Sequence, residues 1–183
     1  MKSSVKIFAP ATISNVGPGF DLMGFALEQP GDIMIVARND SGILRIINNT
    51  ESDLPLDPGK NVASVAVDAL LDTLGCRTGF DLIFESKINP GSGIGSSAAS
   101  CTAAVVGVNE LLNRPFSQKD LLPFAMKGEF VASGSIHADN VAPALLGGFI
   151  LIRNYDPIDI IRIDAPLELI CTVSHPDIQI KTS

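Results

Sequence analysis

The chain has 183 residues, of which 46% are hydrophobic and 18% are charged, and its formal net charge is −7 at pH 7. This length allows one full domain, or one domain with part of another, and the apolar fraction is sufficient for a sizeable core. The acidic balance excludes a fold-wide basic surface, so we expect no nucleic-acid partner. The sequence contains no apolar window of roughly 18 residues, which a membrane-spanning helix needs, so we expect a cytoplasmic protein without a membrane partner.

Seven segments of the chain show the alternation or the short apolar runs that are typical of β-strands. The segments over residues 32–38 and 42–47 are separated by a turn sequence, which predicts that they pair as a hairpin. The Gly- and Pro-rich stretch 12–21 is predicted to be a loop. Strands are predicted over residues 5–10, 32–38, 42–47, 80–86, 149–154, 158–164 and 168–174.

Three further segments have the apolar spacing of helices. Asn61 is expected to cap a helix over residues 62–74. A second helix over residues 97–113 is almost entirely small or aliphatic, so we expect it to be buried on most sides. A third helix over residues 118–132 is expected to bend at Pro123. The order of strands, helix, strand, helices and strands predicts an α+β fold.

The strongest motif is a Gly-rich stretch between a predicted strand and the predicted helix 97–113. Its glycines allow the backbone to approach a ligand closely, and its amides and the helix N-terminus attract an anion. The adjacent hydroxyls of Ser96 and Ser97 can donate to phosphate oxygens or bind a metal ion. The alternative is a flexible turn with a Ser cap, and the spacing matches neither a Walker A loop nor a dinucleotide fingerprint. The stretch consists of Pro90, Gly91, Ser92, Gly93, Ile94, Gly95, Ser96, Ser97, Ala98, Ala99 and Ser100.

Two other stretches place polar side chains among Gly, Pro and apolar residues. Asn15 and Asp21 are the polar positions of the loop 12–21, where an ordinary turn with Asx capping is the alternative. His137, Asp139 and Asn140 lie in a second unusual loop region. An imidazole, an acid and an amide in an apolar setting can orient a small polar substrate. The alternative there is a helix N-cap beside a histidine without a role.

Glu129 lies on an otherwise apolar face of the predicted helix 118–132. A carboxylate at such a position is either solvated or a ligand for a hard cation such as Mg²⁺. Taken alone, the position favours the solvated carboxylate.

The three motifs, in this order along the chain, resemble those of the GHMP small-molecule kinases, and most closely those of the homoserine kinase branch. Pro90 to Ala99 is similar to their phosphate loop, the segment 15–21 to their N-terminal motif, and the segment 135–144 to their third motif. The resemblance covers essentially the whole chain. It implies a two-layer α+β domain related to the second domain of a small-subunit ribosomal protein, with a left-handed βαβ unit.

The resemblance also implies roles for individual residues, with ATP and Mg²⁺ as cofactors and L-homoserine as the acceptor. The phosphate loop Pro90–Ser100 would cradle the ATP phosphates, and Asn61 lies in the region that receives the adenine. Ser97 and Glu129 match the positions that hold Mg²⁺. Homoserine would contact Asn15, Asp21, His137, Asp139 and Asn140. Of these, Asn140 and Asp139 are the candidate catalytic residues, with Asp139 either a base or a substrate ligand.

The implied reaction is phosphorylation of the homoserine hydroxyl to O-phospho-L-homoserine, a step on the route to threonine. Two other functions stay open at this point. One is a GHMP kinase with another acceptor, such as mevalonate or a cytidyl-erythritol, although the His-Ala-Asp-Asn stretch argues against it. The other is a nucleotide-binding module without catalysis. Family members are often dimers, so the resemblance favours a homodimer.

The chain ends directly after a strand-like stretch, whereas family members carry a second, ferredoxin-like domain. Residues 175–182 resemble the strand and turn where homoserine kinases cross towards that domain. We therefore expect residues 1–183 to be the N-terminal ATP-binding domain of a longer kinase. Such a piece would contact nucleotide but would have weak catalysis or none.

Overall fold

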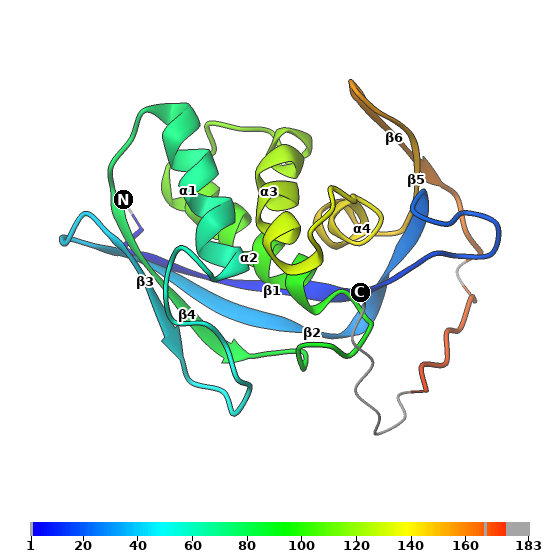
Figure 1. The fold of residues 1–183 in the computed structure, drawn as a ribbon, viewed down its shortest axis with the longest axis horizontal. Helices are drawn as coiled ribbons and strands as arrows, with labels where there is room; N and C mark the ends of the chain where they lie inside the picture. Colours follow the sequence, from blue (N-terminus) through cyan, green and yellow to red (C-terminus); the bar gives the residue numbers. More distant parts are fainter. Residues whose placement is uncertain (1, 167, 175–183) are drawn as a thin grey trace.

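The computed structural model describes residues 2–166 and 168–174 and shows a two-layer α+β fold. In the described part, helices cover one face of a six-stranded mixed sheet (Figure 1). The strands are β1 (Ser4–Ser14), β2 (Met23–Asn39), β3 (Leu44–Asn48), β4 (Gly79–Ser86), β5 (Phe149–Tyr155) and β6 (Ile158–Ile163). The helices are α1 (Val62–Leu74), α2 (Ser96–Leu111), the 3₁₀ turn η1 (Lys119–Leu121), α3 (Leu122–Ser133) and α4 (Val141–Leu146). The predicted fold class is thus confirmed.

The long strand β2 organises the sheet because it pairs with three other strands. It is antiparallel to β1 along most of its length, from Ser4 opposite Ala37 to Ser14 opposite Gly24. Its C-terminal half also pairs with β4, and its first residues pair with β5. Both β1 and β2 extend into the predicted loop 12–21 and its flank, which confines the connection between them to residues 15–22. The remaining loop therefore lies at one end of the sheet.

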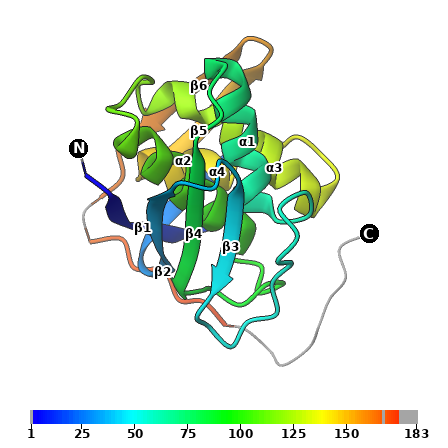
Figure 2. The ribbon, with the colours of Figure 1, turned by 90° about the vertical axis from the view of Figure 1, so that its left-hand side faces the viewer.

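The predicted hairpin of residues 32–38 with 42–47 is wrong. Strand β3 pairs in parallel with β4, and β4 lies between β3 and β2 (Figure 2). The reason is burial: Phe80, Leu82 and Phe84 of β4 are all buried, so β4 takes an interior position, whereas Ile47 of β3 is 37% exposed at the edge. The connection from β3 through α1 to β4 makes a βαβ unit, whose hand stays a prediction.

Three predicted helices form, with changes at their ends. Asn61 caps α1 by accepting a hydrogen bond from the Ala63 amide, as expected. The predicted bend at Pro123 is instead a break between η1 and α3, because a proline is tolerated in the first turn of a helix. The short helix α4 falls in a stretch expected to be a loop. In the described part of the chain, no helix combines the length and the apolar character that a membrane crossing requires.

Helix α2 is buried between the sheet and the helices α1 and α3, as its small and aliphatic composition predicted. Small residues let the surrounding elements approach it closely. A Cβ at Gly107 of α2 would lie 2.4 Å from Val36 Cγ2 of the sheet, and one at Gly128 of α3 would lie 2.7 Å from Cys101 Sγ of α2. This packing fixes the axis of α2, and with it the position of its N-terminus.

The predicted strand 168–174 does not form. Its residues have no strand assignment, and Leu169, Ile170 and Val173 are exposed. An apolar run becomes a strand only when a neighbouring strand accepts its hydrogen bonds, and the described part of the sheet ends at β6. Residues 175–182, which resemble a crossing to a second domain, lie outside the described residues.

Truncation in the interior strand should cost much more stability than truncation in the edge strand. We expect Leu82→Ala to lower the free energy of unfolding by about 2–5 kcal/mol, because it leaves a cavity between the sheet and the helices. Ile47→Ala, at a half-exposed position of β3, should change it by less than about 1 kcal/mol. Urea denaturation measures both values. Equal losses at the two positions would contradict the edge position of β3.

Candidate functional site

The Gly-rich stretch forms an open loop that leads from β4 into α2. Gly91, Gly93 and Gly95 all have positive φ, between 69° and 78°, a region that disfavours other residues. A Cβ at Gly95 would also lie 2.0 Å from Thr12 Oγ1 of β1. Gly95 is the N-cap of α2, and neither a capping side chain nor an acidic residue occupies the first turn. The amides of this turn are therefore available to an anion.

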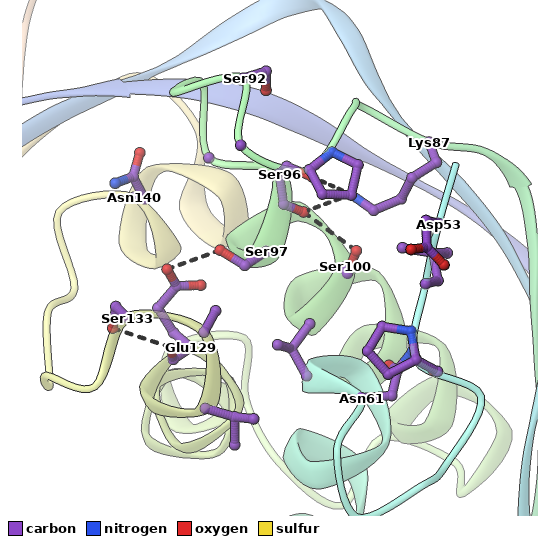
Figure 3. A pocket seen from close by; sticks show the side chains of 18 of the residues that line it. Asp53, Asn61, Lys87, Ser92, Ser96, Ser97, Ser100, Glu129, Ser133 and Asn140 are labelled. Carbon is purple, nitrogen blue, oxygen red and sulfur yellow. Dashed lines mark hydrogen bonds between the residues drawn. The ribbon is translucent and has the colours of Figure 1, made fainter. Parts of the chain in front are cut away.

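The loop borders a cavity of about 760 Å³, a volume typical of small-molecule sites (Figure 3). Its lining brings together the loop, the N-cap of α1, the start of α2, the end of α3 and the start of α4. Two buried atoms of the lining, Ser92 Oγ and Glu129 Oε2, have no hydrogen-bond partner among the described residues. The predicted site residues that line it are Asn61, Pro90, Gly91, Ser92, Gly93, Gly95, Ser96, Ser97, Ser100, Glu129 and Asn140.

Three residues of the predicted phosphate loop are not part of this lining. Ala98 and Ala99 are fully buried in the core, because α2 turns these two positions towards its neighbours. Ile94 packs against the core, and its carbonyl accepts a hydrogen bond from the Thr12 amide. These residues hold the loop against β1.

Ser97 and Glu129 meet across the cavity although they lie on different helices. The Ser97 hydroxyl donates to Glu129 Oε1 at 2.9 Å, and the second carboxylate oxygen is free of partners in the described chain (Figure 3). Burial raises the pKa of Glu129, while the Ser97 hydrogen bond opposes the shift. Figure 3 places both side chains next to the phosphate loop.

This pair fits Mg²⁺ as it is bound beside a nucleotide. No group of three or more His, Cys, Asp or Glu side chains that could hold a metal occurs among residues 2–166 and 168–174. Mg²⁺ in such sites takes one or two protein ligands, and phosphate oxygens and water complete its shell. A serine hydroxyl and an unpartnered carboxylate oxygen beside a phosphate loop are the right donors for that arrangement.

Asn140 joins the cavity to strand β1. Thr12 Oγ1 donates to Asn140 Oδ1 at 2.8 Å, and Asn140 Nδ2 donates to Ser14 Oγ at 3.1 Å. The amide is thus fixed in orientation while it lines the cavity. Its neighbour Asp139 is 4% exposed and lies against β2, where a Cβ at Gly24 would approach the Asp139 carbonyl oxygen to 1.9 Å.

The other predicted acceptor residues gather outside the cavity lining, beside Asn140. Asn15 Oδ1 accepts the Asp21 amide at 2.8 Å, which closes the loop between β1 and β2. His137 Nδ1 lies 3.7 Å from Asp21 Oδ1. The five residues of the first and third motifs therefore lie side by side, although more than a hundred residues separate the two motifs.

Tyr155 of β5 holds these two motifs together, and sequence reasoning missed it. Its hydroxyl donates to the Asp21 carbonyl at 2.7 Å and accepts from the Ala138 amide at 3.2 Å. The only signal in the sequence was that Tyr155 is the single tyrosine of the chain. Sequence reasoning also missed Lys87 of the cavity lining, since it belongs to no motif. Asp53 and Lys60 of the lining lie in the loop before Asn61, which the resemblance assigned as a whole to the adenine region.

The chain is similar in sequence and structure to proteins named as kinases. Residues 61–148 match the family described as GHMP kinases N terminal domain. The chain is 46% identical to a homoserine kinase of Chloroherpeton thalassium over 96% of this chain and 59% of that protein, and 39% identical to one of Methanococcus vannielii over 97% and 59%. The chain thus spans about three fifths of the length of these curated relatives.

Solved structures show the same likeness. The homoserine kinase of Cytophaga hutchinsonii matches with a TM-score of 0.85 and 49% identity over 91% of this chain and 53% of that one. The mevalonate kinase of Methanococcus jannaschii matches with a TM-score of 0.70 and 17% identity over 89% and 56%. The second likeness is one of fold alone.

The buried Asp139 makes a testable contribution to stability. Burial raises the pKa of Asp139 above its usual value of 3.8, and hydrogen bonding to Ser14 only partly opposes the shift. A carboxyl that holds its proton more tightly in the folded state destabilises folding once it ionises, so stability falls as the pH rises through the folded pKa. We therefore expect Asp139→Asn to raise the free energy of unfolding at pH 7.

The gain should vanish as the pH falls below about 3.8, where the carboxyl is protonated in both states. Urea denaturation at pH 7 and at about pH 3, with the exposed Asp40→Asn as control, measures the difference. A variant that is less stable than the parent by the same amount at both pH values would disprove this assignment.

Proposed function

We propose that the chain, whose residues 61–148 match the N-terminal domain of GHMP kinases, is the nucleotide-binding part of a homoserine kinase. The reaction is transfer of the γ-phosphoryl group of ATP to the side-chain hydroxyl of L-homoserine, which forms O-phospho-L-homoserine. Two findings support the acceptor: the high identity to proteins named homoserine kinase, and the polar cluster around Asp21, His137 and Asp139. This product is an intermediate on the route to threonine. We place the enzyme in the cytoplasm.

One observation carries the proposal: Asn140 belongs to both halves of the site. It lines the cavity with the phosphate loop, and it lies next to Asp139 in the motif that contacts the β1–β2 loop. A phosphoryl group that leaves a nucleotide on the loop would thus meet an acceptor held by the neighbouring cluster. In-line positioning of this kind supplies much of the rate of phosphoryl transfer.

On the nucleotide side, the open amides of the loop and of the first turn of α2 bind the phosphates. Asn61 and the residues before it receive the adenine at the opposite end of the cavity. Ser97 and Glu129 would hold Mg²⁺, which neutralises the charge of the transferring group. A cation bound there would oppose the raised pKa of Glu129, because it stabilises the ionised carboxylate.

On the acceptor side, the acidic groups Asp21 and Asp139 attract the ammonium group of homoserine. Asn15 and His137 complete this end of the pocket, and the amide of Asn140 contacts the reacting hydroxyl. Asp139 acts as a substrate ligand rather than as a base, since it lies outside the cavity lining that Asn140 reaches. The chain functions within a homodimer of the longer kinase.

The choice of acceptor is tested by coupled ADP release, run with the full reading frame that encodes this chain. We expect ADP release to rise many-fold with L-homoserine and to stay at the level without acceptor when mevalonate is added. If only mevalonate stimulates ADP release, the acceptor is mevalonate and not homoserine. Tight ADP binding without stimulation by either compound would indicate a nucleotide-binding module.

The role of Asp139 is tested by the steady-state kinetics of Asp139→Asn in the same protein. Loss of a charge that binds the ammonium group should raise the KM for homoserine by about tenfold or more, with a much smaller change in kcat. The KM for ATP serves as the internal control and should not change. A fall in kcat of about a hundredfold at unchanged KM would identify Asp139 as the catalytic base instead.

A further inference from the structure

A buried ion pair lies directly beneath the phosphate loop and belongs to none of the motifs above. Asp32 of β2 and Lys87, the residue after β4, approach to 3.1 Å between Asp32 Oδ2 and Lys87 Nζ. Their side chains are 0% and 3% exposed. Figure 3 shows the Lys87 side chain running along the base of the loop towards Ser96. A buried pair of this kind needs a physical reason, because an apolar pair of the same volume is often at least as stable.

The lysine contacts both ends of the loop at once. Besides Asp32, its Nζ donates to the Ile88 carbonyl at 3.0 Å and to the Ser96 carbonyl at 2.9 Å, and it also contacts Ser96 Oγ. Ile88 lies two residues before Pro90, where the Gly-rich stretch begins, and Ser96 is the first residue of α2. One ammonium group therefore joins the two points between which the loop is suspended.

The aspartate fixes the same two ends from the sheet. Asp32 Oδ1 accepts the Ile88 amide at 2.9 Å, and Asp32 Oδ2 accepts the Ser100 hydroxyl at 2.7 Å. Ser100 lies one turn into α2 and also donates to the Ser96 carbonyl. Asp32 is held in turn by β2, the strand that organises the sheet. The pair thus anchors both ends of the loop to strand β2.

Burial opposes the charge on both partners. It raises the pKa of Asp32 and lowers the pKa of Lys87, while the attraction between the two groups works against each shift. The three hydrogens of an ammonium group are all engaged by protein oxygens at these distances. Lys87 therefore has no donor left for a ligand in the cavity, although its side chain forms part of the lining. Its effect on a nucleotide must pass through the loop.

We propose that Asp32 and Lys87 form a positioning clamp that holds the phosphate loop in its anion-binding shape before the nucleotide arrives. The clamp rests on the proposed function in one respect, namely that the loop binds nucleotide phosphates. Neither residue contacts the nucleotide. A preorganised loop binds more tightly because its backbone loses little conformational entropy when the ligand binds.

The clamp is tested by equilibrium binding of two probes, ADP with Mg²⁺ and adenosine, to the protein of the full reading frame. Adenosine lacks the phosphates that the loop would hold, so it reports the rest of the cavity. Lys87→Met leaves Asp32 as a buried, unpaired charge. The double variant Asp32→Asn with Lys87→Met removes both charges and keeps an acceptor for the Ile88 amide. The control is Arg45→Met with Asp81→Asn, which removes the exposed ion pair between β3 and β4.

We expect the double variant to bind ADP about tenfold more weakly than the parent and adenosine within about twofold of it. The control pair should bind both probes as the parent does. Equal weakening of ADP and adenosine would overturn the proposal in favour of a general structural role, as would unchanged ADP binding. A double variant that stays unfolded even with saturating ADP would also overturn it. Failure of the parent to bind ADP would refute the proposed function instead.

Discussion

The burial of helix α2 is the constraint on which the rest of the site depends. This helix is apolar on nearly every side, so it is stable only when the sheet covers one face and α1 and α3 cover the others. Its axis is then fixed, and its free N-terminus points out of the core at the end of β4. The loop and the cavity follow from that geometry, because the chain must cross from β4 to the start of α2 in a few residues.

The same packing brings together residues that are distant in sequence. Ser97 at the start of α2 meets Glu129 of α3, and Thr12 and Ser14 of β1 fix Asn140 at the start of α4. Each of these contacts joins elements that already pack for apolar reasons. The polar side chains of the site therefore need few additional contacts to be ordered, because the elements that carry them are already fixed by packing.

Patterns that act locally could be predicted from the sequence, and those that depend on partners could not. The Asn61 cap and the burial of α2 follow from nearby residues. The position of β3 at the edge could not be predicted from the sequence. Two short apolar strands with a turn between them favour a hairpin, but here the more buried β4 lies between β2 and β3. The sequence indicated half of the cavity lining. Lys87 and Tyr155 lie outside any motif and act through contacts to motif residues.

Three buried carboxyl groups lie close to the Gly-rich loop or to the polar cluster beside Asn140. Asp32, Glu129 and Asp139 are the buried acidic residues of the described chain, and burial raises the pKa of each. Of these three groups, only Asp32 has a lysine partner, and that lysine contacts the chain at Ile88 and at Ser96 of the Gly-rich loop. Glu129 and Asp139 lack such a partner in the described chain, so a cation bound beside either carboxyl would favour its ionised form. A metal ion beside the phosphates and an ammonium group on the acceptor would each relieve one of them. Under the proposed function, ionisation of these two carboxyl groups would therefore be favoured when both cations are bound.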